Sequence, residues 1–157
     1  MLHPRIIPCL LIHKKGLVKT KRFKNSTYIG DPLNAVKIFN EKFVDELIVL
    51  DIDATVNSKE PDYDLISKLA IECRMPLCYG GGITNKNQVI KILKLGVEKV
   101  AISSLAINNP ELIKEISTLV GIQSIVAVLD VKKKKFSNNY NIYLSNGKKN
   151  TNLNVFE

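Results

Sequence analysis

The sequence predicts an α/β protein: about five βα units that form the N-terminal portion of an incomplete (β/α)8 barrel of the TIM type. Two observations lead to this class. Short apolar runs rich in Ile, Leu and Val alternate with amphipathic stretches along the 157 residues, as expected of buried parallel strands covered by helices. A glycine triplet at residues 80–82 follows the third expected strand. A doubly wound nucleotide-binding fold carries its glycines after the first strand, so the barrel is favoured.

The first two units occupy the first half of the chain. Residues 5–12 are the first expected strand, and an Asp-Pro cap then opens a helix over about residues 32–42. Residues 46–51 (ELIVLD) are too short and too rich in β-branched residues for a helix, so they are the second expected strand. A second helix over residues 65–73 follows a Pro-Asp start signal.

Three more strands and two helices follow in alternation. Residues 76–79, 99–103 and 124–130 are the expected strands. Between them, a helix capped by Thr84 ends at Gly96, and a helix opened by an Asn-Pro pair at residues 109–110 ends at a glycine, residue 121. Right-handed crossovers would place all five strands side by side in one parallel sheet.

The last part of the chain departs from this alternation. Residues 136–144 alternate as a hairpin would, with residues 138–139 near its turn, and residues 147–157 are expected to be a loop followed by the start of a helix. A complete barrel needs eight strands and about 250 residues. We therefore expect residues 1–157 to be a single partial barrel domain, truncated at its C-terminus.

Composition narrows the classes of function. The net charge is +8, but no aromatic residues interleave with the basic ones as a single-strand nucleic-acid surface requires, so no nucleic-acid partner is expected. The charge does favour an anionic, phosphorylated ligand. The start of the chain lacks a cleavage site and no apolar run reaches about 18 residues, which indicates a cytoplasmic protein without a membrane partner. The three cysteines are not spaced as zinc ligands, and no metal or other cofactor is expected.

Candidate site residues lie at the ends of the expected strands. In α/β folds the working residues gather at the carboxyl ends, where glycine backbone can approach an anion closely. Gly81 and Gly82 there, with Ser103 and Ser104 one strand along, predict a phosphate site. Asp130 ends an otherwise apolar strand, and it is either a general acid or base at the barrel mouth or a carboxylate that caps a loop.

A second set of residues marks the opposite ends of the strands. Arg5, Glu46 and Lys99 open the first, second and fourth strands. Charges of opposite sign at the floor of a barrel can pair across it. Composition alone favours a polar plug that closes the bottom of the barrel.

Several runs resemble the cyclase subunit of imidazole glycerol phosphate synthase, in order and nearly without gaps: RIIPCL from residue 5, DEL and LDI around the second strand, GGGI from residue 80, NPELI from residue 109 and GKK from residue 147. The resemblance implies a lyase-type β/α barrel whose glutaminase partner releases ammonia, which passes through the barrel to a phosphorylated substrate at the mouth. It also assigns roles. The matches are Gly81, Gly82, Ser103 and Ser104 for one substrate phosphate, Lys19 for the loop over the substrate, Asp130 for acid–base catalysis, and Arg5, Glu46 and Lys99 for an ammonia gate rather than a plug.

One departure from the family pattern changes the expected function. The family pairs a catalytic Asp after the first strand with the one matched by Asp130, but this chain has Leu11 at the first position. Leucine cannot transfer a proton, and loss of one acid–base partner commonly costs at least about 100-fold in rate. The pattern resembles cyclase-like proteins of bacterial surface-polysaccharide gene sets, which are thought to supply ammonia to a separate sugar amidotransferase. A genuine histidine-pathway cyclase and a non-catalytic half-barrel remain the alternatives.

Overall fold

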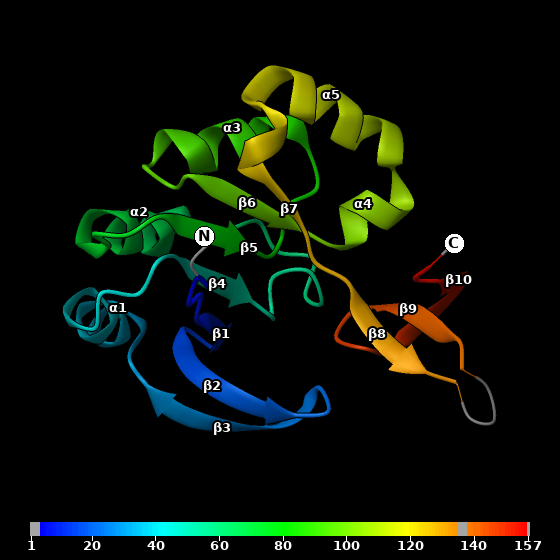
Figure 1. Ribbon diagram of the computed structural model, residues 1–157, viewed down its shortest axis with the longest axis horizontal. Coiled ribbons are helices and arrows are strands. Elements are labelled where there is room, and N and C mark those ends of the chain that lie inside the picture. The colour runs from blue at the N-terminus through cyan, green and yellow to red at the C-terminus, as the bar shows by residue number, and fades with distance from the viewer. Residues whose placement is uncertain (1–3, 135–137, 157) are drawn as a thin grey trace.

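The computed structural model describes residues 4–134 and 138–156. A curved seven-stranded sheet carries helices on its outer face (Figure 1), and its strand order is β3-β2-β1-β4-β5-β6-β7. Five of these strands form the parallel core of the sheet, with neighbours paired in the order β1, β4, β5, β6 and β7. Their bounds are Cys9–His13, Leu47–Asp51, Leu77–Gly80, Lys99–Ile102 and Ile125–Ala127. The α/β class and the parallel βα units are therefore confirmed.

The helices follow the strands as the sequence predicts, with one addition. Each long helix begins at a side chain that accepts a backbone N–H three residues on, and these caps are Asp31, Asp62, Asn85 and Asn109. The cap predicted at Thr84 is wrong by one residue, because the Thr84 hydroxyl bonds to Gln88 instead. The bounds are α1 Pro32–Glu41, α2 Tyr63–Glu72, α3 Lys86–Lys94 and α5 Pro110–Val120, and the short α4 (Ser104–Asn108) was not predicted. No helix among the described residues is long and apolar enough to cross a membrane.

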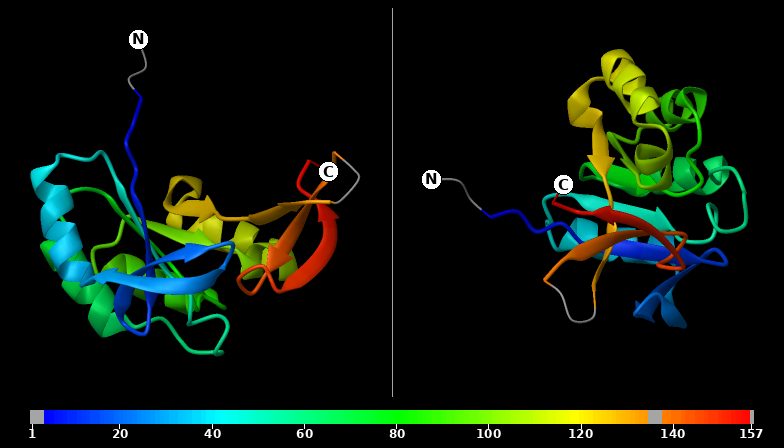
Figure 2. Two further views of the ribbon diagram at one scale, coloured as in Figure 1. Left: turned by 90° about the horizontal axis from the view of Figure 1, so that it is seen from below. Right: turned by 90° about the vertical axis from the view of Figure 1, so that its right-hand side faces the viewer.

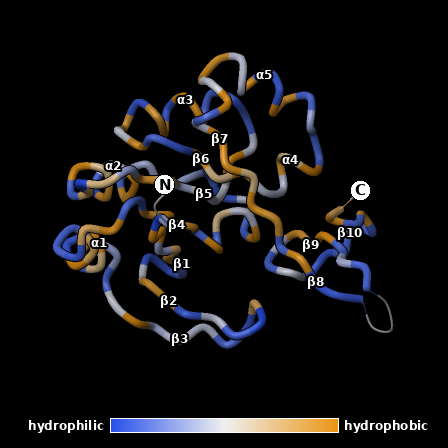
Figure 3. Tube along the Cα trace, viewed as in Figure 1, coloured by the Kyte–Doolittle hydropathy of each residue, from blue (hydrophilic) through white to orange (hydrophobic). Residues whose placement is uncertain are grey.

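Alternation along the strands divides the sheet into two faces. Val49, Tyr79 and Val100 are in register, fully buried and packed under the helices. The helices alternate hydrophobic and hydrophilic residues to match (Figure 3). This layer between helices and sheet is the core that fixes where each strand ends.

The N-terminal part of the sheet differs from the prediction. The first strand begins at Cys9 rather than at residue 5, since Pro8 has no N–H for the ladder, although its carbonyl accepts the N–H of Ile48 at 2.9 Å. The chain then turns at Lys14 and Lys15, both with positive φ, into an unpredicted hairpin of β2 (Gly16–Lys21) and β3 (Lys24–Gly30). Two-residue turns of this hand match the twist of antiparallel strands.

A second sheet lies on the side of the molecule away from α1 and α2 (Figures 1 and 2). It has the order β10-β9-β8, with bounds Asp130–Lys133 for β8, Tyr140–Leu144 for β9 and Lys149–Asn154 for β10. The hairpin prediction holds for β9, but its partner is β8, and part of the predicted turn lies outside the described residues. The helix predicted at the end of the chain is wrong: the side chains of Thr151 and Asn150 bond across to β9 instead.

The inner face of the sheet is only partly covered. Leu11 and Leu50 are in register on this face and half-buried, and Cys9 beside Ile48 is exposed. The sheet also ends in two edges, β3 and β7. An apolar face and two edges left open favour contact with another molecule.

We therefore predict that this 157-residue chain, prepared alone, self-associates. Light scattering after size exclusion should show a mass that rises with concentration. Leu50→Glu, which places a charge on the inner face, should lower the mass, whereas Ile71→Glu on the exposed side of α2 should not. A monodisperse monomer with one cooperative melting transition would contradict the prediction.

Candidate functional site

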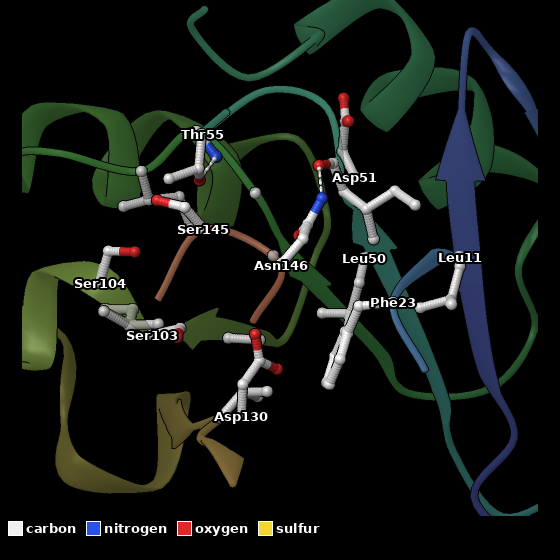
Figure 4. A pocket seen from close by; sticks show the side chains of 18 of the residues that line it. Leu11, Phe23, Leu50, Asp51, Thr55, Ser103, Ser104, Asp130, Ser145 and Asn146 are labelled. Carbon is white, nitrogen blue, oxygen red and sulfur yellow. Dashed lines mark hydrogen bonds between the residues drawn. The ribbon is translucent and has the colours of Figure 1, made fainter. Parts of the chain in front are cut away.

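A pocket of about 250 Å³ lies where the parallel strands end (Figure 4). Its walls combine the carboxyl ends of β4, β5 and β6 with residues from the β2–β3 hairpin and from the second sheet. Of the residues that the sequence predicts for the mouth of the barrel, the pocket brings together Gly81, Gly82, Ser103, Ser104 and Asp130. Carboxyl ends of parallel strands meet at one edge of a sheet, which is why Gly81 and Gly82 share this pocket with Ser103 and Ser104, while Asp130 reaches it from the second sheet.

The glycine turn is shaped by close backbone approach. Gly81 has φ +123°, and a Cβ placed on it would lie 2.4 Å from the carbonyl oxygen of Asp51. Gly82 has φ +71°, and its Cβ would lie 2.6 Å from the carbonyl oxygen of Lys59. Only glycine fits both positions. The Gly82 N–H donates to the Thr55 hydroxyl at 3.1 Å, so the turn is also held by the loop that follows β4.

The serine pair continues the polar wall of the pocket. Ser103 follows β6 directly and Ser104 begins α4, and both are half-buried. Figure 4 shows their side chains on the same side of the pocket as Asp130. Two hydroxyl groups beside a glycine turn are donors that suit an anionic oxygen.

Asp130 is the carboxylate that faces this polar wall. It was predicted to end the fifth strand, but β7 ends at Ala127 and Asp130 opens β8 in the second sheet, where its register partner is Tyr143. Burial raises the pKa of Asp130, while the backbone N–H of Gly147 acts in the opposite direction. A half-buried carboxyl group with a raised pKa is suited to exchange a proton.

The opposite wall of the pocket is apolar. Leu11, Leu50 and Phe23 lie together there, across from Asp130 (Figure 4). Asp51 also lines the pocket and burial raises its pKa, but one of its carboxylate oxygens accepts the N–H groups of Asp53 and Ala54. Figure 4 shows this carboxylate directed away from Asp130, so Asp51 does not replace an acid at position 11.

Lys19 lies outside the pocket lining. It is exposed on β2, and its neighbour Thr20 lines the pocket instead. Thr20 and Phe23 come from the hairpin that sequence reasoning missed, and Ser145 and Asn146 come from the missed β9–β10 turn. The Ser-Asn-Gly run at residues 145–147 is a signal that could have located the β9–β10 turn, whereas Arg22 and Phe23 in the β2–β3 turn give none.

At the other end of the sheet, two of the three predicted floor charges meet. The Lys99 Nζ lies 2.7 Å from each carboxylate oxygen of Glu46. Glu46 is only 5% exposed, and Lys99 opens β6 on the inner face, in register with Cys78. Arg5 is exposed and joins no ion pair within residues 4–134 and 138–156.

Other ionisable groups do not gather into a metal site. Across the described part of the chain, no three His, Cys, Asp or Glu side chains are placed to hold a metal ion. Burial raises the pKa of the Cys78 thiol to about 12, and the neighbouring Glu46 carboxylate adds to the effect. This thiol therefore stays protonated beside the floor pair at neutral pH.

Comparison with known proteins identifies the family of this chain. The model of the histidine biosynthesis protein family matches residues 5–157. The chain belongs to this family. It is 56% identical over 153 residues to a Leptospira interrogans protein and 55% identical over 157 residues to a Vibrio vulnificus protein, both named provisionally as imidazole glycerol phosphate synthase subunit HisF. These matches cover 98% and 100% of the chain and 60% of each relative.

A relative whose name as imidazole glycerol phosphate synthase subunit HisF is not provisional is less similar to this chain than the Leptospira and Vibrio proteins are. The imidazole glycerol phosphate synthase subunit HisF of Lactococcus lactis subsp. cremoris is 39% identical over 157 residues, all of this chain and 61% of the relative. The chain thus spans about 60% of the length of these curated relatives. This chain is therefore more similar to the two provisionally named relatives than to the Lactococcus lactis protein.

The close approach at Gly81 in the glycine turn yields a stability prediction, for which Gly96, outside that turn, is the comparison. Gly96→Ala should cost about 1–2 kcal/mol, because φ is +100° there but the nearest atom, Ala70 Cβ, is 3.5 Å away. Gly81→Ala should cost clearly more, since its methyl group also meets the backbone of Asp51. Denaturant unfolding at one protein concentration measures both free energies. Equal losses would show that close approach does not shape this turn.

Proposed function

We propose that this chain is part of a cyclase-like subunit of an imidazole-glycerol-phosphate-synthase-type glutamine amidotransferase complex. In this proposal a glutaminase partner docks at the floor of the barrel, and ammonia passes along the inner face to a phosphorylated acceptor at the mouth. The observation that carries the proposal is the presence of two polar sites at opposite ends of one sheet, the Glu46–Lys99 pair and the pocket around Asp130.

The inner face between these sites supports a path for ammonia. Lys99 and Cys78 are in register at the floor. Two residues further along each strand, on the same face, Ala101 and Gly80 are in register at the pocket wall. These residues present small side chains and a protonated thiol, none of them charged, along the path proposed for a small neutral molecule. In this proposal the Glu46–Lys99 pair stands at the entrance, with the Glu46 carboxylate buried and paired with the partly buried Lys99 ammonium.

The polar half of the pocket supports a phosphate-bearing acceptor, with donors from the glycine turn and from Ser103 and Ser104. The apolar half argues against cyclisation, because Leu11 leaves Asp130 without a second carboxylate across the pocket. We therefore propose that the complex delivers ammonia for amidation of a surface-polysaccharide sugar by a separate enzyme. The alternative, a genuine cyclase of histidine biosynthesis, is favoured by Asp130 itself and by the similarity to the unqualified HisF subunit.

One assay separates these two functions. The intact subunit that contains this chain, supplied with the synthase's ribonucleotide substrate and saturating ammonium, should form no measurable imidazole glycerol phosphate. The physical reason is the missing proton-transfer partner at position 11. Titration with inorganic phosphate serves as the control for a folded site and should still show binding. Robust turnover would contradict the proposal and favour the histidine pathway.

A second prediction tests the gate. In the intact complex, Lys99→Ala should leave reaction with added ammonium intact but release more free ammonia into solution for each glutamate formed, because the floor is no longer closed. The matched control is Lys94→Ala, which removes an exposed charge from the last turn of α3. An unchanged ratio of free ammonia to glutamate in Lys99→Ala would make the Glu46–Lys99 pair a structural plug.

A further inference from the structure

A third hydroxyl group, that of Thr55, lies beside the glycine turn. Thr55 belongs to the irregular loop between β4 and α2, at residues 52–62, and it lines the pocket. Its Oγ1 accepts the Gly82 N–H at 3.1 Å. Figure 4 shows the Thr55 side chain on the side of the pocket that carries Ser103 and Ser104. Three hydroxyl groups therefore share this wall with the glycine turn.

The Thr55 hydroxyl has a hydrogen left to donate. A hydroxyl group carries one hydrogen, which rotates to suit its partner, and two lone pairs. One lone pair accepts the Gly82 N–H, and within residues 4–134 and 138–156 no protein acceptor takes the hydrogen. A hydroxyl oxygen that already accepts a hydrogen bond is polarised and donates its own hydrogen more strongly. The group is therefore suited to an anionic oxygen in the pocket.

The same bond decides how the glycine turn can act on an anion. The N–H of Gly82 is engaged by Thr55 rather than directed at a ligand. A Cβ on Gly82 would lie 2.6 Å from the carbonyl oxygen of Lys59 and 2.9 Å from the Cβ of Ala54, so the loop packs directly on the glycine. The polarity of this N–H group thus reaches the pocket through the Thr55 hydroxyl.

The loop that carries Thr55 is fixed to the end of β1. Both carboxylate oxygens of Asp53 are used: the His13 Nδ1 lies 2.6 Å from one, and the Lys14 N–H donates to the other at 2.7 Å. Burial acts to raise the pKa of Asp53, but the Lys14 N–H and His13 together lower it below its ordinary value. The Asp53 N–H in turn donates to Asp51 at 2.8 Å. Thr55 therefore follows, two residues later, from backbone that is held on both sides.

We propose that Thr55 is an anion-binding residue of this pocket: its hydroxyl accepts the Gly82 N–H and donates its hydrogen to an oxygen of the phosphate-bearing acceptor. The inference rests on the proposed function, from which the phosphate is taken, and adds a residue to that site. The donors are then hydroxyl groups from two different loops, Thr55 after β4 and the pair Ser103 and Ser104 after β6, placed around one glycine turn.

Calorimetric titration of the chain with inorganic phosphate tests the assignment. Thr55→Val keeps the shape of the side chain and removes the hydroxyl, and it should raise the Kd for phosphate about ten-fold, as loss of one hydrogen bond to a charged group implies. Thr55→Ser keeps the hydroxyl and should restore binding. Thr118→Val is the matched control, because this exposed hydroxyl on α5 also bonds to backbone, at Lys114, but lies outside the pocket lining. It should leave the Kd unchanged.

Backbone amide NMR separates a lost donor from a loosened turn. In Thr55→Val the Gly82 resonance should move, since its acceptor is gone, while those of Gly81 and Ile83 should stay in place. Weaker binding accompanied by displaced Gly81 and Ile83 resonances would indicate a structural role alone and would overturn the inference. If the valine variant does not fold, Thr55→Ala takes its place with the same expected results.

The remaining outcomes distinguish this inference from the proposed function. Unchanged binding in Thr55→Val would overturn the inference alone and leave the phosphate site in place. Tighter binding would also overturn it, because Thr55 would then compete with the anion for the Gly82 N–H. Absence of phosphate binding by the unsubstituted chain would contradict the proposed phosphate site and this inference together.

Discussion

The close approach of three glycines to their neighbours is the constraint on which the site depends. A Cβ at Gly80 would lie 2.8 Å from the carbonyl oxygen of Ala101, and Cβ atoms at Gly81 and Gly82 would meet the backbone of Asp51 and Lys59. The triplet is thus the point where the ends of β4, β5 and β6 and the loop after β4 contact one another. A single side chain at this point would push those strands apart and open the pocket.

The same parallel register connects the two ends of the sheet. Since side chains alternate between faces, Lys99 on the inner face implies that Ala101 is on the inner face as well, two residues nearer the mouth. On β5 and β6 the helix-covered face takes the bulky Tyr79 and Val100, while Gly80 and Ala101 lie on the inner face. The ion pair at the floor and the strand-end part of the pocket at the mouth therefore follow from one strand register, while turns and the second sheet complete the pocket.

Much of this arrangement could be predicted from sequence because it depends on periodicity and strand order. The five parallel strands, the four long helices and the meeting of Gly82 with Ser103 follow from strands whose carboxyl ends share an edge, whereas Asp130 reaches the same pocket from the second sheet. The β2–β3 hairpin could not be predicted, because Lys14 and Lys15 in the turn before it and Arg22 and Phe23 in its own turn are in left-handed backbone, which their residue types do not indicate. The second sheet was missed for a related reason: polar Asn and Thr side chains, not apolar alternation, join β10 to β9.

The elements that the sequence did not predict, the β2–β3 hairpin and the second sheet, contribute side chains to both the apolar and the polar wall of this pocket. Phe23 joins Leu11 in the apolar wall, while Asn146 ties the turn of the second sheet to the carbonyl oxygen of Ile52. The glycine turn and the floor pair belong to the parallel sheet and its ends, whereas Asp130 and the β9–β10 turn belong to the second sheet. A change from carboxylate to leucine at position 11 leaves the sheet, its register and the floor pair intact, because Leu11 faces the interior beside Leu50. The scaffold can therefore keep the proposed anion site and the proposed ammonia entrance while the reaction at the mouth changes, which is the physical basis for proposing ammonia delivery without ring closure.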